Sequence, residues 1–114
     1  MPRAWTAGRV LSADLEGADA IMGAETPWVA VSGEHDEVDG GGTVLVFAGS
    51  STGAPPIRWF VRTEPFPIVA PSPSFDEHIV LAPGDELTLR HRHVFGDRRG
   101  TADETRALAA ELAP

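Results

Sequence analysis

The sequence has no cysteine, no lysine and little positive charge, and these absences narrow the chemistry available to it. Without cysteine, the 114-residue chain has no disulfide, no thiolate nucleophile and no cysteine-ligated zinc. Seventeen acidic residues against nine arginines give a net charge of −8, which disfavours nucleic-acid phosphates and anionic membrane surfaces as ligands. We therefore expect no nucleic-acid partner and no membrane partner.

Long apolar runs are missing as well. No stretch approaches the roughly 18 residues that a transmembrane helix requires, and the first ten residues lack the apolar core of a signal peptide. With 42% hydrophobic residues, the chain still has the composition of a packed domain. We therefore expect a single soluble, cytoplasmic domain over residues 1–114.

The sequence does contain short apolar runs, separated by twelve glycines and ten prolines. Strands are predicted at 8–11, 27–33, 43–49, 57–62, 78–81 and 86–95. The continuous apolar run 43–49 indicates a central strand buried on both faces. Alternate prolines keep the extended segment 66–75 out of a central strand, and "APGD" (82–85) is typical of a tight turn. Short strands at this spacing predict a mainly β fold, an antiparallel β-sandwich.

The C-terminal segment has a different pattern, which predicts one helix over 101–112. Thr101 is suited to the N-cap, and Glu104, three residues later, completes a capping box. Leu108 and Leu112 are four residues apart and form a narrow apolar stripe that can pack on the sheet. We expect no second domain.

No nucleotide-binding motif is present. The glycine-rich stretch "DGGGT" (39–43) precedes a predicted strand, whereas a phosphate-binding loop leads from a strand into a helix. We expect no cofactor.

Two histidines stand out in "TLRHRHVFGD" (88–97). His91 and His93 are two residues apart on a predicted strand, so their side chains share a face about 6–7 Å apart. By the same alternation they share that face with Leu87 and Leu89. Three interpretations stay open: structural or surface histidines that extend a core stripe, residues that line a ligand pocket, and a pair of metal ligands. A third metal ligand would have to come from elsewhere, and His78, His35 and Asp36 qualify only by residue type.

His35 and Asp36 lie in the acidic stretch "EHDE" (34–37), at the predicted tip of a hairpin. Neighbouring strand residues point apart, but a loop can project both side chains into one cleft, where they would serve as acid and base or as polar contacts. The alternative is a solvated acidic turn.

The stretch "RWFVRTEP" (58–65) places Arg58 and Arg62 on one strand face with Phe60 between them. Such a face can clamp a carboxylate or stack on a sugar ring. The alternative is an outer face on which the arginines form ion pairs with Glu64.

Four segments resemble, in order, the C-terminal half of the PmoA-like family, whose members are soluble β-proteins named after a methane oxygenase subunit. These segments are "ETPWVAVSGEHD", "TVLVF", "RWFVRTEPFP" and "FDEHIVLAPGDELTLRHRHVFGD". The resemblance covers nearly the whole chain. It implies half of a mutarotase-like β-supersandwich and a role in acting on, or binding, carbohydrate-type small molecules.

The chain also departs from the family pattern. Met1 falls inside it, which leads us to expect a truncated form that pairs with a second copy or with a complementing chain. The loop "AGSSTGAPP" (48–56) replaces an "HPxNP"-like loop. His91 stands where the family commonly has an aromatic residue and His93 where it has an aliphatic one, which implies that both are inward-facing packing positions.

Our leading hypothesis is therefore a PmoA-like protein that handles a sugar or another small molecule. His35 and Asp36 would be the catalytic pair, Trp59 the stacking platform and Arg62 the clamp, with His91 and His93 as further ligand-binding candidates and no metal. The alternative is a non-catalytic interaction module, or a remnant that requires a partner chain.

Overall fold

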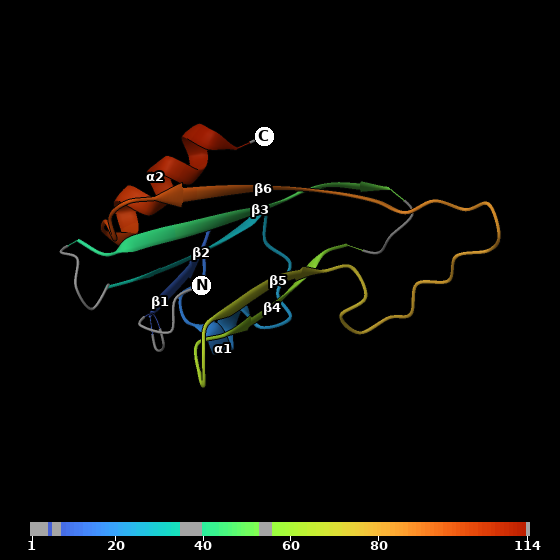
Figure 1. Cartoon of the computed structure of the whole chain (residues 1–114), viewed down its shortest axis with the longest axis horizontal. Coiled ribbons are helices and arrows are strands. Elements are labelled where there is room, and N and C mark those ends of the chain that lie inside the picture. Colours follow the sequence, from blue (N-terminus) through green and yellow to red (C-terminus); the bar gives the residue numbers. More distant parts are fainter. Residues whose placement is uncertain (1–4, 6–7, 35–39, 53–55, 114) are drawn as a thin grey trace.

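The computed structural model describes residues 5, 8–34, 40–52 and 56–113 of the chain (Figure 1). Within these ranges the elements follow in the order β1 (Arg9–Ser12), α1 (Ala18–Ile21), β2 (Trp28–Gly33), β3 (Gly42–Thr52), β4 (Arg58–Arg62), β5 (Ile68–Ser72), β6 (Thr88–Gly96) and α2 (Ala102–Leu112).

The strands form two antiparallel sheets. A four-stranded sheet has the order β1-β2-β3-β6, and a two-stranded sheet consists of β4 and β5. The apolar run predicted as a central strand is β3, which pairs with both β2 and β6, and its residues Leu45, Val46 and Phe47 are buried. The predicted mainly β, antiparallel fold with a C-terminal helix is confirmed.

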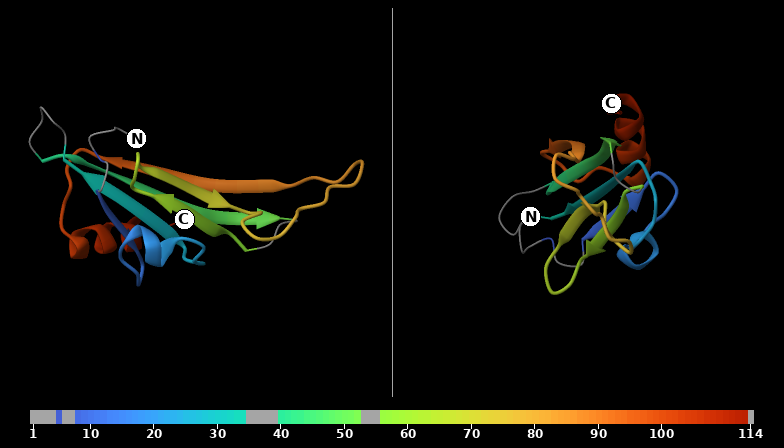
Figure 2. Two further views of the ribbon diagram at one scale, coloured as in Figure 1. Left: turned by 90° about the horizontal axis from the view of Figure 1, so that it is seen from below. Right: turned by 90° about the vertical axis from the view of Figure 1, so that its right-hand side faces the viewer.

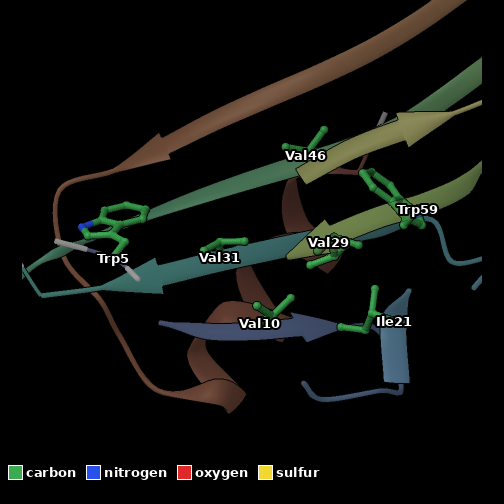
Figure 3. Close-up of a cluster of buried hydrophobic side chains, with 8 residues drawn as sticks. Trp5, Val10, Ile21, Val29, Val31, Val46 and Trp59 are labelled. Atoms are coloured by element: carbon green, nitrogen blue, oxygen red, sulfur yellow. The ribbon is translucent and has the colours of Figure 1, made fainter. Parts of the chain in front are cut away.

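The larger sheet packs one face on the smaller sheet and the other on α2 (Figure 1). Alternation along each strand divides the apolar residues between these two layers. The inner cluster, between the sheets, contains Trp5, Val10, Ile21, Val29, Val31, Val46, Trp59 and Val61 (Figure 3). The outer cluster, beneath α2, contains Leu11, Trp28, Ala30, Leu45, Phe47 and Ala109.

One end of the inner cluster is closed by Trp5, and two glycines make room for its ring. Gly33 and Gly42 are opposite each other on β2 and β3. A Cβ at either position would meet the Trp5 ring at 2.8 Å, which is closer than side-chain carbons approach one another. Glycine is required here by the close approach of the indole.

Helix α2 begins as the sequence predicts. The Thr101 hydroxyl accepts a hydrogen bond from the Glu104 backbone N–H, and the Glu104 carboxylate accepts one from the Thr101 backbone N–H, both at 3.1 Å. These bonds satisfy two backbone donors that a helix start otherwise leaves open. The Thr101 hydrogen bonds, together with the Arg98 guanidinium 2.7 Å away, lower the pKa of Glu104.

Three expectations about the elements were wrong. Residues 78–81, predicted as a strand, form none, and the Val80 side chain is 85% exposed. Strand propensity reflects packing on a pleated surface, and no sheet face receives these side chains. Strand β3 continues to Thr52, beyond the predicted end at 49. The short helix α1 was missed because four residues are too few to show a helical period.

The histidines of β6 lie on the predicted face but are not packed. His91, His93 and Phe95 are opposite Ala48, Val46 and Val44, so they share the inner face of the sheet with Leu89. Their shared face is confirmed. The expectation of packing is wrong for His93, which is exposed, whereas His91 is half-buried. The smaller sheet has only two strands and leaves the inner face of β6 uncovered.

Candidate functional site

A cleft of about 660 Å³ lies between the outer face of the larger sheet and the C-terminal end of α2. Its walls come from β2, β3, β6 and the helix, and most of the lining is apolar. The lining residues are Pro27, Trp28, Phe47, Ala48, Gly49, Arg90, His91, Arg92, Ala109, Ala110 and Ala113.

The cleft exists because the helix is narrow where it passes over two large rings. Trp28 and Phe47 are opposite each other on β2 and β3 and belong to the outer cluster. Above them lie Ala109 and Ala110 of α2 and its C-cap residue Ala113, each with a single methyl group. Larger aliphatic side chains at these positions would fill the space. Beneath the alanines the two rings are themselves largely buried, with Trp28 6% and Phe47 2% exposed.

Two arginines line the β6 side of the cleft. Arg90 and Arg92 alternate with the histidines and therefore lie on the face that α2 covers. Arg92 donates a hydrogen bond from Nη1 to the Leu112 carbonyl oxygen at 2.8 Å, which places a cation at the negative end of the helix dipole. Arg90 is exposed and has no hydrogen-bond or ion-pair partner among the described residues.

An irregularity in the sheet lies beside Arg90. The β3–β6 register pairs Ala48 with His91 and Ser51 with Leu89, so two residues of β3 are opposite Arg90 alone, as in a β-bulge. Gly49 is one of the two, and a Cβ at this position would overlap the Arg90 carbonyl oxygen. Bulges commonly redirect a side chain next to a binding site, and this one is adjacent to the unpaired cation.

Trp59, predicted as a stacking platform, is inside the protein. Its side chain is 0% exposed in the inner cluster, and its indole Nε1–H donates a hydrogen bond to the Thr26 carbonyl oxygen at 2.8 Å. A stacking platform must present a ring face to solvent, and Trp59 presents none. The alternation correctly predicts that Trp59 and Arg58 point to different faces of β4. The face that carries Trp59 is the one that packs into the core.

The arginines of β4 are on the opposite face from Trp59, as expected. Arg58 lies 3.2 Å from Glu25 and 3.8 Å from Asp76 and donates a hydrogen bond to the Gly23 carbonyl oxygen. Arg62 is exposed, and its guanidinium carbon lies 5.2 Å from the centroid of the Phe60 ring. The ion-paired interpretation therefore fits Arg58, with Glu25 and Asp76 as partners in place of Glu64.

The remaining predicted site residues are not brought together. His35 and Asp36 lie outside the described residues. His91 belongs to the inner face of β6 but borders the end of the cleft, and its buried Nδ1 has no hydrogen-bond partner among the described residues. His93 is exposed on the uncovered inner face. Within the described part of the chain, no group of three or more histidine or acidic side chains is arranged to hold a metal ion.

Sequence reasoning missed Trp28, Phe47, Arg90 and Arg92. A signal was present, because the alternation that puts His91 and His93 on one face puts Arg90 and Arg92 on the other. The two leucines of α2 do not indicate which face of the sheet the helix covers, so the sequence does not predict that α2 lies over Arg90 and Arg92.

The fold and the cleft define an antiparallel β-protein with one covering helix and an apolar hollow that has arginines on its rim. The chain matches over residues 1–110 a family described as a family of unknown function (DUF6807), and it belongs to that family. Comparisons with curated proteins and with solved structures give no significant match. The family description names no activity, so the resemblance to PmoA-like proteins stays a prediction. Neither helix in the described ranges has the length and apolar character needed to span a bilayer.

Proposed function

We propose that this protein binds a small organic carboxylate with an apolar body in the cleft between the sheet and α2. The observation that carries the proposal is the combination of an aromatic floor with an unpaired arginine, Arg90, at the rim. The volume of about 660 Å³ is in the range of small-molecule sites.

Arg90 is a cation without an internal partner in the described part of this acidic protein, which makes it a candidate to bind an anionic ligand. Among the described arginines, Arg58, Arg98 and Arg99 form ion pairs with carboxylates, and Arg9, Arg92 and Arg106 donate hydrogen bonds to backbone carbonyl oxygens. Arg90 has no such partner among the described residues, and a guanidinium presents parallel N–H donors that match a carboxylate. The mostly apolar lining of the cleft, with Pro27 and the alanines around the largely buried rings of Trp28 and Phe47, would take the rest of the ligand.

Binding, with no assigned reaction, is the function that this geometry supports. Of the residues that line the cleft, His91 alone has a side chain of a type that serves as a general acid or base, and none is an acidic residue, a serine or a threonine. An acid–base pair or an activated nucleophile would need a second such group within hydrogen-bond reach.

The PmoA-like resemblance implies a carbohydrate-type ligand, and a sugar acid could bind by the same contact between a carboxylate and Arg90. A sugar acid carries the carboxylate that Arg90 would bind and an apolar ring face that can lie against the apolar lining of the cleft. The alanines of α2 offer no hydrogen-bonding side chains for sugar hydroxyls. The cleft therefore favours an aromatic or aliphatic acid over a sugar acid.

The proposal is tested by calorimetric titration with phenylacetate, hexanoate, glucuronate and neutral glucose. The Arg90→Gln variant should weaken carboxylate binding by about 10- to 100-fold, because hydrogen bonds to a charged group contribute roughly 1.5–3 kcal/mol. Arg62→Gln, on the other sheet, is the matched control and should bind as the wild type does. Equal affinities for wild type and Arg90→Gln, or weakening by Arg62→Gln alone, would refute the proposal.

A further inference from the structure

Strand β6 is an edge strand with an uncovered apolar face. It pairs with β3 on one side only, and no other described strand pairs with its second side. On its inner face Phe95 is 76% exposed and Leu89 and His93 are also exposed. Natural sheets protect such edges with charged side chains, proline, a bulge or a covering segment. Of these, β6 has the charged side chains Arg90 and Arg92, which lie on its outer face. Strand β6 is nine residues long and contains no proline, and the only irregularity in its pairing is on the β3 side.

A second unusual feature immediately precedes this strand. Residues 73–87, which we call the arm, connect β5 to β6 without any helix or strand and project beyond the end of the sheet (Figures 1 and 2). At its base Phe75 lies against Gly23, and Asp76 is 3.8 Å from Arg58. Connections of this length without regular structure are uncommon in small domains and are often functional.

The outer part of the arm has the character of a strand without a partner. In "HIVL" (78–81) Val80 is 85% exposed and Leu81 is 51% exposed. The backbone groups of 78–81 form no hydrogen bond with other described residues, whereas the following turn is closed by a bond from the Asp85 N–H to the Ala82 carbonyl oxygen at 3.0 Å. This segment is extended, apolar and free to pair.

The charges of the arm and of β6 are complementary. The arm carries Glu77 before the apolar segment and Asp85 and Glu86 after it, and all three are exposed. Strand β6 carries Arg90 and Arg92 and no acidic residue. Pairing two β6 edges directly would instead bring arginine rows together, which is unfavourable. An acidic, apolar, extended segment is the occupant that this edge fits, and the chain itself contains one.

We propose that two copies of this chain associate by placing the arm of each copy along the free edge of β6 of the other. Each arm would add a strand to the partner's larger sheet, as in β-strand addition. The contact is closed by a two-fold axis, because every chain contributes one arm and one edge. Because neighbouring strand residues point to opposite faces, one of Val80 and Leu81 would join Leu89 and Phe95 on the inner face and the other would lie on the outer face. The exposed apolar side chains of the arm and of the inner face of β6 would thereby be removed from water.

The oligomeric state gives the first test, by light scattering after size exclusion. The wild type should be a dimer whose dissociation constant rises with salt, because salt screens the attraction between the arm and β6. Replacing Val80 and Leu81 by aspartate should weaken the dimer by at least about tenfold, since buried apolar anchors dominate interfaces. Leu108→Asp, an exposed leucine on α2, is the control and should leave the dimer intact. A wild type that is monomeric at every concentration would overturn the proposal.

Disulfide cross-linking then tests which surfaces meet. The sequence has no native cysteine, so every disulfide formed must join the substituted positions. Chains with cysteine substituted for Ile79, Val80 or Leu81 are mixed with the His93→Cys variant and oxidised. At least one arm position should form a disulfide between different chains, which requires Cα atoms within about 7 Å. Leu108→Cys should form none. Cross-links only between two His93→Cys chains, or within one chain carrying both substitutions, would overturn the proposal.

Discussion

Trp59 and Arg90 have opposite surroundings, and these determine what each side chain can do. Trp59 is fully buried between the two sheets, and its one polar group is satisfied by the Thr26 carbonyl oxygen. Arg90 is exposed at the rim of a mostly apolar cleft and has no partner among the described residues. The tryptophan therefore holds the sheets together, and the arginine is available to a ligand.

Replacing Trp59 by phenylalanine should destabilise the fold without affecting ligand binding. The change removes the hydrogen bond to the buried Thr26 carbonyl and leaves a cavity beside Val29 and Val61. A buried unsatisfied acceptor and a cavity together should cost about 2–4 kcal/mol of unfolding free energy in urea titrations. Phe66→Leu, at an exposed position, should change stability by less than about 0.5 kcal/mol. An unchanged stability with lost binding would restore the stacking role.

At this scale the sequence predicts the face of a residue better than its burial. Alternation correctly put Trp59 and Val61 together, Arg58 and Arg62 together, and His91 with His93. Which face becomes core depends on the layer that packs against it. That layer is set by contacts between distant segments, which the alternation of one strand does not encode.

At the scale of elements, α2 forms both the lid of the outer cluster and a wall of the cleft. Its start is held by the capping box at Thr101 and Glu104, which the sequence predicts from residue types three positions apart. Its end is held by the Arg92 bond to the Leu112 carbonyl oxygen, which joins segments 20 residues apart and has no local signal.

The Glu104 carboxylate should make stability depend on acid pH. Its pKa is lowered in the folded protein by the Thr101 hydrogen bonds and by Arg98. A lowered folded pKa gives a contribution that is complete above the ordinary carboxyl pKa of about 4.3 and is lost as pH falls through the folded value. Unfolding midpoints of the wild type and Glu104→Gln should therefore differ at pH 7 and converge at low pH. Curves that stay equally separated at every pH would contradict this origin.

Filling the alanine face of α2 should abolish ligand binding while the fold is kept. Ala110 is exposed and lines the cleft, so a leucine in its place would occupy the volume over Trp28 and Phe47. We expect Ala110→Leu to lower affinity by at least about tenfold, with stability changed by less than about 0.5 kcal/mol as for other surface substitutions. Ala107→Leu, on the same helix but outside this cleft, is the control. Equal binding by all three proteins would place the ligand elsewhere.

At the scale of the whole molecule, the fold is asymmetric. A four-stranded sheet is covered by a helix on one face and by two strands on the other, and the inner face of β6 remains open. The sequence predicts the number and type of most elements, because each short apolar run lies between glycines and prolines. It does not predict how many strands each sheet receives, since pairing is decided by contacts between segments far apart in the chain.

The same asymmetry explains why the strand predicted at 78–81 is absent. "HIVL" has the composition of a strand, and the following "APGD" forms its turn as predicted. In the isolated chain these residues have no neighbouring sheet face on which to pack. The proposed dimer would supply that face, so residues 78–81 would form their strand by pairing with β6 of the other copy.

The central claim, that Arg90 and the apolar cleft together recognise a carboxylate, is tested most directly by comparing phenylacetate with its neutral amide. Both have the same ring and nearly the same shape, so the apolar floor cannot distinguish them. The wild type should prefer phenylacetate by about 10- to 100-fold, the effect of hydrogen bonds to a charged group. Arg90→Gln should lose that preference while it still binds the amide as the wild type does. Equal affinity of the wild type for the two compounds, or a preference that survives in Arg90→Gln, would contradict the account.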